Sequence, residues 1–330
     1  MNLGSRNDKF NERCAKMIPM SHIYDLAIIG GGPGGAAAGV YASRKRLKTV
    51  FITKDWLGQS NVSEKIENWV GTIAISGLEL STSLEKHVKA YAEGIIDFKE
   101  GELCTQIQKS DTEDAVFTIS TDKGSYQAKT ILITSGSSRR TLDVPGAKEY
   151  DNKGLTYCAT CDGPLFADQD VVVVGGGNAG FESAAQLLAY CKSVTLLSRS
   201  EFKADPGTVE KVLSNPKMRA ITNALPKEVR GEKFVTSFTY TDTASGTDIT
   251  LPVTGVFVEV GSIPNSSFVK DIVKLDQYNR IPVDPRTQMT STPGIWAAGD
   301  VTDGLYHQNN IAAGDAVKAL EDIYLYIHAK

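Results

Sequence analysis

The sequence predicts an α/β protein with two Rossmann-like dinucleotide-binding units. A strand-like apolar run, a G-x-G-x-x-G loop and a helical segment follow one another over residues 24–42, and the same order recurs over residues 170–190. In such a loop the first glycine makes a tight turn, the second lets backbone N–H groups approach a pyrophosphate, and the third lets helix and strand pack closely. One such loop is weak evidence, whereas two in one chain indicate two dinucleotide sites.

Composition agrees with a globular protein of ordinary type. The chain has 330 residues, of which 41% are hydrophobic and 22% charged, so it has room for two domains with sizeable cores. Its formal net charge of −4 argues against nucleic acid or an anionic membrane as the main partner. Residues 1–22 are polar and lack the apolar core of a signal peptide, so we expect a disordered extension, with Met20 as a possible alternative start, and a cytoplasmic protein without a membrane span.

The first unit occupies the N-terminal part of the chain. The run at 24–29 enters the loop at 30–35, and a helix over 36–42 follows. The next strand ends at Thr53, where such folds usually place an acid for the ribose. Composition predicts an irregular surface loop over 58–69. Beyond it we expect a helix and then three strands, at residues 79–93, 116–121, 126–128 and 129–134.

The second unit repeats this pattern about 145 residues later. A strand at 170–174 enters the loop at 175–180, and a helix over 181–190 and a strand over 194–197 follow. An enzyme that passes hydride between a flavin and a nicotinamide needs two such sites. The remaining predicted elements are strands at 234–241, 248–251 and 255–260, a short apolar strand within 294–300 that is closed by Gly299-Asp300, and a C-terminal helix at 308–326.

A cysteine pair lies shortly before the second loop. Cys158 and Cys161 are two of five cysteines, and Asp162 directly follows them. A tetrahedral zinc site needs four ligands and no second C-x-x-C is present, so we expect no metal and favour a pair that cycles between dithiol and disulfide over an inert buried pair. A carboxylate near a thiol disfavours the thiolate, so Asp162 is better suited to transfer protons than to lower the pKa of the attacking thiol. Asp162 can also serve as a turn residue. The other cysteines are Cys14 in the extension and Cys104 and Cys191, which we expect to be core or surface thiols.

These motifs together resemble one family. The chain resembles the low-molecular-weight thioredoxin reductases and the closely similar flavoprotein subunit of alkyl hydroperoxide reductase over residues 23–328. The resemblance is carried, in order, by IIGGGPGGAAAGVYASR, GQSNVSEKIENW, ILITSG, YCATCDG, VVVVGGGNAG, GVFVEVGSIPN and GIWAAGDVTDGLYHQ, of which YCATCDG is the most specific.

The resemblance implies a fold of the pyridine nucleotide-disulfide oxidoreductase type and a homodimer. The FAD domain would comprise residues 23–140 and 263–330, and residues 141–262 would form an inserted NAD(P)H domain that carries the cysteine pair. The residues implied to contact FAD are Gly30, Gly32, Pro33, Gly35, Gln59, Asn68, Gly136, Gly299, Asp300 and Gln308. Those implied to contact the nicotinamide cofactor are Gly175, Gly177, Asn178, Gly180, Arg199 and Lys203.

The resemblance also implies a reaction cycle. Reduced nicotinamide would give hydride to FAD, the flavin would reduce the disulfide through Cys161, and Cys158 would attack the disulfide of thioredoxin or a glutaredoxin-like protein, with Asp162 as proton donor or acceptor. In the resembled family flavin and substrate cannot reach the pair in one conformation, so the inserted domain would rotate. We place its hinges near residues 140 and 263.

The electron donor is the least determined part of this expectation. In place of the His-Arg-Arg run of NADPH-using members, residues 198–203 read SRSEFK. Arg199 and Lys203 can still bind a 2′-phosphate, which favours NADPH. Gly180 is more typical of NAD sites, and no acid stands at Ser198 for a 2′-hydroxyl, so NADH and a non-nicotinamide donor such as ferredoxin stay open. A flavin-binding redox sensor without turnover is the alternative of a different class, and the intact pair and both loops speak against it.

Overall fold

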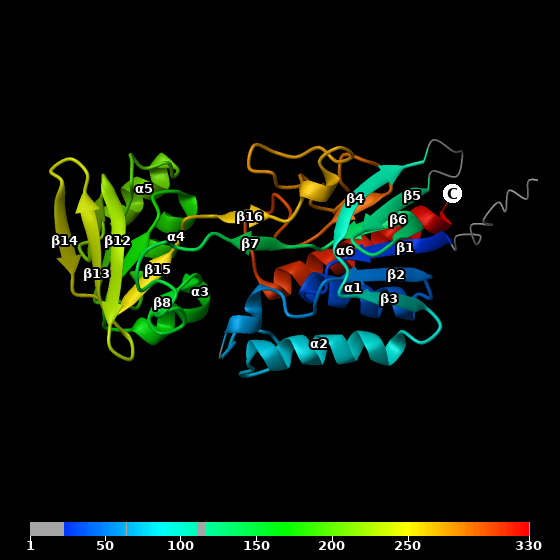
Figure 1. Cartoon of the computed structure of the whole chain (residues 1–330), viewed down its shortest axis with the longest axis horizontal. Helices are drawn as coiled ribbons and strands as arrows, with labels where there is room; N and C mark the ends of the chain where they lie inside the picture. Colours follow the sequence, from blue (N-terminus) through cyan, green and yellow to red (C-terminus); the bar gives the residue numbers. More distant parts are fainter. Residues whose placement is uncertain (1–22, 64, 111–115, 330) are drawn as a thin grey trace, which may run out of the picture.

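The computed structural model describes residues 23–63, 65–110 and 116–329. The predicted extension at residues 1–22, with Met20 and Cys14, lies outside the described residues. Figure 1 shows two layered α/β units joined by an extended pair of strands, β7 (Ser137–Arg139) and β16 (Ser262–Pro264). The first unit contains the N-terminal and C-terminal parts of the chain, and the middle of the chain forms the second unit.

The first unit is built on a seven-stranded sheet of order β3-β2-β1-β6-β5-β4, with β17 also paired to β6. Three helices cover one face and share a core with Leu26, Phe51 and Trp296, and residues 268–283 pack on the other face. The strands are β1 (Ile23–Ile29), β2 (Thr49–Thr53), β3 (Ile96–Glu100), β4 (Cys104–Lys109), β5 (Phe117–Thr121), β6 (Ser125–Ile133) and β17 (Ile295–Ala297), and the helices are α1 (Pro33–Arg44), α2 (Gly77–Tyr91) and α6 (Asn309–His328).

The second unit is built on a parallel five-stranded sheet of order β11-β10-β9-β15-β8. Phe181 of one helix packs against one face, and Phe238 of a separate three-stranded sheet packs against the other. The parallel strands are β8 (Leu155–Thr156), β9 (Asp170–Val174), β10 (Ser193–Leu197), β11 (Met218–Ile221) and β15 (Gly255–Val258); the helices are α4 (Asn178–Leu187) and α5 (Pro206–Leu213); the small sheet is β12 (Ala224–Gly231), β13 (Val235–Asp242) and β14 (Thr247–Leu251).

Several predicted element boundaries were wrong. The two strands predicted at 126–128 and 129–134 are one strand, β6. Its first residues are partly exposed and its last four are buried, so the change in composition marks a change of environment and not a break. Helix α4 begins at Asn178, within the glycine loop and three residues before the predicted start, and ends three residues before the predicted end. The sequence reading missed β3, β4, β11, β12 and α5, because their apolar periodicity is short or interrupted by polar residues.

The strands that connect the two units lie side by side. β7 and β16 pair antiparallel with Arg139 opposite Ser262, and Arg140 N donates to Gly261 O at 3.1 Å. The chain therefore enters and leaves the second unit through one two-stranded ribbon, which runs between the units in Figure 1. The predicted domain bounds at 140/141 and 262/263 fall at this ribbon; they and the hinges stay a prediction.

In the described part of the chain, no helix has the length and apolar character that a membrane crossing requires. The same residues contain no group of three or more histidine, cysteine or acidic side chains that could hold a metal ion.

Candidate active site

The first glycine loop directly follows β1. Gly30 has a φ of +116°, and a Cβ there would lie 2.3 Å from Thr134 O, so only glycine fits this turn. A Cβ on Gly35 would lie 1.8 Å from Gly30 O, which shows how closely α1 packs on the end of β1. A Cβ on Gly32, by contrast, would meet no heavy atom within 4 Å. The loop thus closes tightly on the sheet and leaves open space in front of Gly32.

A cavity of about 1080 Å³ lies in front of this loop. It sits where the strand order reverses between β1 and β6, which is where open α/β sheets bind ligands. The predicted site residues that line it are Gly30, Gly32, Pro33, Gln59, Asn68, Gly136, Gly299, Asp300, Gln308, Cys158 and Cys161. Gly35 lies behind the loop. The structure therefore brings nearly all the residues implied to contact FAD to one cavity, together with the cysteine pair.

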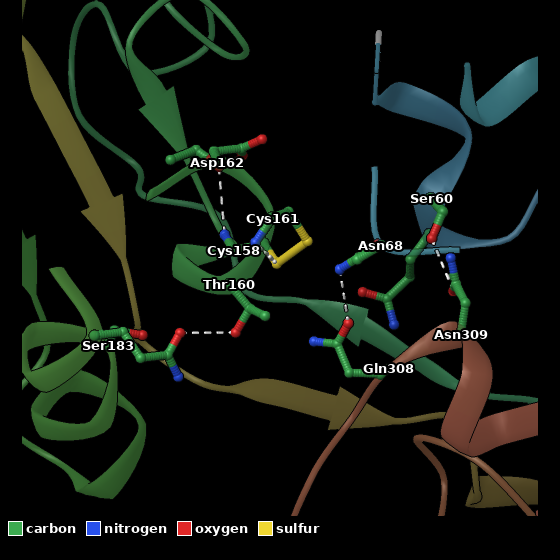
Figure 2. Close-up of a disulfide and its surroundings, with 12 residues drawn as sticks. Ser60, Asn68, Cys158, Thr160, Cys161, Asp162, Ser183, Gln308 and Asn309 are labelled. Atoms are coloured by element: carbon green, nitrogen blue, oxygen red, sulfur yellow. Dashed lines mark hydrogen bonds between the residues drawn. A yellow bond between two sulfur atoms is a disulfide. The ribbon is translucent and has the colours of Figure 1, made fainter. Parts of the chain in front are cut away.

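The segment over residues 58–69, expected to be a surface loop, forms one wall of this cavity. It contains the short helix η1 (Gln59–Val62). Gln59 Nε2 donates to Asp300 Oδ2 at 3.3 Å, and Asn68 Nδ2 donates to Gln308 Oε1 at 3.2 Å, as Figure 2 shows for the second pair. These hydrogen bonds join parts of the chain about 240 residues apart, so this wall of the cavity forms only when the chain has folded.

The cavity has the character of a dinucleotide site. Asn61 Oδ1 is buried at its wall and has no hydrogen-bond partner among the described residues. The acid expected at the end of β2 is present two residues later as Asp55, which lines the cavity and whose backbone carbonyl accepts from Thr53 Oγ1 at 2.5 Å. With the open space at Gly32, these residues fit FAD. Asp55 was missed because it follows the strand end by two residues.

The cysteines form a disulfide that opens on the cavity. Cys158 and Cys161 are bonded with Cα atoms 5.3 Å apart at the start of α3 (Ala159–Asp162), where Cys161 N donates to Cys158 Sγ at 3.1 Å. Cys161 is exposed and Cys158 is half-buried. In Figure 2 the disulfide lies between its own helix and the Asn68–Gln308 pair. In this orientation Cys161 is therefore the more exposed residue of the pair.

Asp162 is held by a residue that the sequence did not single out. Its carboxylate accepts a hydrogen bond from Thr156 Oγ1, and that hydroxyl oxygen accepts from Cys158 N at 3.3 Å. Thr156 is buried at the end of β8. The threonine thus links the acid to the backbone of the first cysteine, and no sequence motif could have pointed to it.

The second glycine loop repeats the geometry of the first. A Cβ on Gly175 would lie 2.2 Å from Glu259 O, one on Gly180 would lie 2.0 Å from Gly175 O, and one on Gly177 would meet open space. Asn178 Oδ1 accepts from Asp205 N at 2.8 Å and so ties the loop to the start of α5. None of the six residues implied to contact the nicotinamide cofactor is among the residues that line the first cavity.

The segment predicted to recognise the 2′ position lies beside this second loop, where Lys203 N donates to Gly176 O at 2.8 Å. The side chains of Arg199 and Lys203 are exposed, and neither forms an ion pair with a described residue. Ser198 is buried, and its Oγ would lie 2.2 Å from a Cβ on Gly176, so it packs beneath the loop. Two exposed cations are therefore available here, and position 198 itself carries no carboxylate.

Glu259 is an acid that sequence reasoning missed. It follows β15, next to β9, where the strand order of the second sheet reverses. Burial raises the pKa of its carboxyl group to about 7, and a 2.5 Å hydrogen bond from Ser183 Oγ and the charge of Arg139 oppose that rise. The carboxyl group thus belongs to a residue that packs against the second loop, and its pKa is near neutrality.

The two unpaired cysteines of the described residues lie in the hydrophobic cores. Cys104 and Cys191 are buried, and burial raises the pKa of Cys104 to about 12 and that of Cys191 to about 11. Because the thiolate is the reactive form, both are core thiols of low reactivity.

The described residues contain two dinucleotide-type loops, a cavity at the first loop and a disulfide that opens on this cavity. These features define an oxidoreductase with a redox-active disulfide. The chain belongs to the pyridine nucleotide-disulphide oxidoreductase family, whose model matches residues 24–316. Enzymes of this family bind FAD and a pyridine nucleotide. The fold expected from the resemblance is thereby confirmed.

Two curated relatives match most of this chain. The F subunit of an alkyl hydroperoxide reductase of Staphylococcus aureus is 38% identical over 305 residues, which is 92% of this chain and 59% of the relative. A protein named NADH dehydrogenase from Bacillus subtilis is 36% identical over 306 residues, which is 92% of this chain and 58% of the relative. The chain thus spans less than two thirds of the length of these relatives.

Solved structures match it along nearly their whole length. A thioredoxin reductase from Streptococcus pyogenes is 32% identical, covers 93% of this chain and 99% of its own, and superposes with a TM-score of 0.83. A thioredoxin reductase from Lactococcus lactis, described as being in the FR conformation, is 31% identical with 93% and 100% coverage, but its TM-score is 0.62.

Proposed function

We propose that this chain is a thioredoxin reductase-like flavoprotein that reduces a protein disulfide through Cys158 and Cys161 with electrons from NAD(P)H. The observation that carries the proposal is that the disulfide lines the same cavity as the first glycine loop. A core disulfide or a metal pair has no reason to open on a dinucleotide-type cavity. Bound there, FAD would supply two electrons to the disulfide.

Cys158, Cys161 and Asp162 have different roles in the proposed thiol chemistry. Once reduced, the Cys158 thiolate attacks one sulfur of the substrate disulfide, and the other substrate sulfur leaves as a thiolate that takes up a proton. The Cys161 thiolate then attacks Cys158 in the mixed disulfide, which releases the second substrate thiol and restores the Cys158–Cys161 disulfide. Asp162, held by Thr156, is the acid placed to exchange these protons.

Two observations support a rotation of the second unit during this cycle. Cys158 is half-buried where the pair faces the cavity, so a protein substrate has poor access to it. The second glycine loop is outside that cavity, so a nicotinamide bound there does not reach the flavin site in this orientation. The ribbon of β7 and β16 is the place where such a turn would occur.

We propose NADPH as the donor, with NADH and ferredoxin as the alternatives. Exposed Arg199 and Lys203 offer two cations for a 2′-phosphate, and Ser198 offers no carboxylate for a 2′-hydroxyl. The experiment is anaerobic flavin reduction by NADPH, NADH and reduced ferredoxin in parallel. Fast bleaching by NADPH supports the proposal, whereas bleaching by ferredoxin alone would remove the nicotinamide part of it.

The thiol assignment has its own test. Cys161→Ser should accumulate a mixed disulfide between Cys158 and thioredoxin, detected by mass spectrometry, because the resolving thiol is missing. Cys158→Ser is the matched control and should accumulate none. A trap formed only by Cys158→Ser would reverse the two roles. Absence of thioredoxin-dependent DTNB reduction with every donor would favour a sensor without turnover.

A second candidate substrate follows from the relatives. The 38% identity to the F subunit of an alkyl hydroperoxide reductase makes a disulfide partner of such a reductase the alternative to thioredoxin. The same Cys161→Ser variant, used to capture partners one purified protein at a time, separates the two. Preferential trapping of the peroxide-reductase partner would assign this chain to that system.

A further inference from the structure

Arg139 lies in the ribbon that joins the two units and contacts the wall of the first cavity. It is half-buried at the end of β7, and its Nε donates to Gln59 Oε1 at 3.0 Å. Gln59 in turn donates to Ser137 Oγ at 3.0 Å and to Asp300 Oδ2 at 3.3 Å. The edge of the guanidinium group is therefore hydrogen-bonded to a side chain that is itself held by two residues of the first unit.

The same guanidinium group faces the second unit. Its central carbon lies 5.7 Å from the ring centroid of Tyr157, the residue that precedes Cys158. Its charge also lowers the pKa of Asp151 and of Glu259, two acids of the second unit, against the rise that burial causes in each. Neither acid forms an ion pair with it among the described residues. Arg139 thus hydrogen-bonds to one unit and interacts with the other through its position over the Tyr157 ring and through its charge.

We propose that Arg139 is a latch that holds the second unit in the orientation in which the disulfide opens on the cavity. The inference rests on the proposed function, in which this orientation alternates with another. A turn about the ribbon would carry Tyr157, Asp151 and Glu259 away from Gln59, so Arg139 cannot keep both sets of interactions. The planar guanidinium group suits this task, because it can donate at its edge while an aromatic ring contacts its face.

The latch assigns Arg139 a positioning role, not a chemical one. Its effect reaches the sulfurs through Tyr157 and the chain segment that leads into Cys158. Removal of the latch should raise the fraction of molecules in which the second unit has turned away from the cavity. The ribbon itself would stay paired, because its backbone hydrogen bonds do not involve the Arg139 side chain.

The neighbouring residue provides a matched control. Arg140 carries the same charge, is exposed, and contributes its backbone N–H to the ribbon by donating to Gly261 O at 3.1 Å. Arg140→Ala therefore changes the net charge and the ribbon sequence as Arg139→Ala does, but leaves the contacts with Gln59 and Tyr157 in place.

The experiment measures how fast Cys158 is alkylated in the FAD-loaded protein. The pair is first reduced under argon with excess dithiothreitol, which becomes the cyclic disulfide. Iodoacetamide then forms a thioether at each free sulfur and iodide leaves, and peptide mass spectrometry follows Cys158. We expect alkylation about tenfold faster in Arg139→Ala, the size expected for a lost charged hydrogen bond. Arg140→Ala should match the parent protein, and Arg139→Lys, which can still donate to Gln59, should lie between.

Small-angle scattering of the same samples gives a second readout. Arg139→Ala should shift the interdomain distance distribution, while the circular dichroism spectrum stays that of the parent. Equal alkylation rates and scattering for Arg139→Ala and the parent would overturn the latch, as would an equal rise in Arg140→Ala. If Arg139→Ala loses FAD, Arg139→Lys decides by the same two measurements.

These readouts need neither nicotinamide nor a substrate protein. Failure of every donor to bleach the flavin, with the alkylation difference intact, would count against the proposed function and not against the latch. Normal donor reduction without the difference would count against the latch alone.

Discussion

The Glu259 carboxyl group should make the second unit less stable as the pH rises, and glutamine at this position should remove that dependence. Burial raises the pKa of this group from 4.5 to about 7. The folded protein therefore binds the proton more tightly than the unfolded chain does. Between these two values the unfolded chain loses the proton first, so the contribution is present below about pH 4.5 and is lost as the pH rises through about 7.

The size of the effect follows from the shift. One pKa unit corresponds to about 1.4 kcal/mol, so the full shift is worth about 3 kcal/mol and the interval from about pH 5 to about pH 8 about 2.5 kcal/mol. The side chain keeps some contact with solvent, so we expect about 1 to 2.5 kcal/mol in practice. Glu259→Gln keeps the acceptor for Ser183 Oγ and removes the charge. The free energy of unfolding of Glu259→Gln, relative to that of the parent, should therefore be larger at about pH 8 than at about pH 5 by that amount.

The assay must report on the second unit. The three tryptophans, Trp56, Trp69 and Trp296, all belong to the other unit, so their fluorescence would not follow this change. Amide hydrogen exchange of β9 and β15, corrected for intrinsic rates at each pH, measures the local free energy of opening. Glu201→Gln, an exposed glutamate of the same unit, is the control. Equal differences between Glu259→Gln and the parent at both pH values would refute the reasoning.

Three further substitutions test other parts of the structure. Arg199→Ala should weaken NADPH binding about tenfold or more, because a phosphate loses a charged partner, and should leave NADH binding unchanged; titration of flavin bleaching measures both. Thr156→Val should slow turnover about tenfold with FAD content unchanged, because Asp162 loses its donor, and Thr156→Ser should restore the rate. Gly35→Ala should lower the free energy of unfolding by about 3 kcal/mol or more and abolish FAD binding, because its Cβ would lie 1.8 Å from Gly30 O. Gly314→Ala, whose Cβ meets no atom within 4 Å, is the control and should be tolerated. Thermal unfolding with flavin release compares the two variants.

The sequence by itself determined the fold class and the local geometry of both loops. Glycine spacing is local information, since the close packing at Gly35 is against Gly30 of the same loop, although the neighbour that confines Gly30 itself is the distant Thr134. The cysteine pair is local in the same sense, because two intervening residues bring the sulfurs within bonding distance. Strands buried on both faces, such as β9, could also be predicted, because their apolar residues are continuous.

Only the tertiary structure decided which of these local features meet. The cavity wall depends on Gln59 and Asn68 reaching Asp300 and Gln308 about 240 residues away, and no local pattern encodes that approach. Glu259, Arg139 and Thr156 were invisible in the sequence for the same reason, since each derives its environment from another element. The orientation that points the disulfide at the first cavity and leaves the second loop outside it is a relation between the two units, and the contacts of Arg139 that we propose to hold it join residues of different elements. Such contacts are long-range and few, so they form only once the chain has folded.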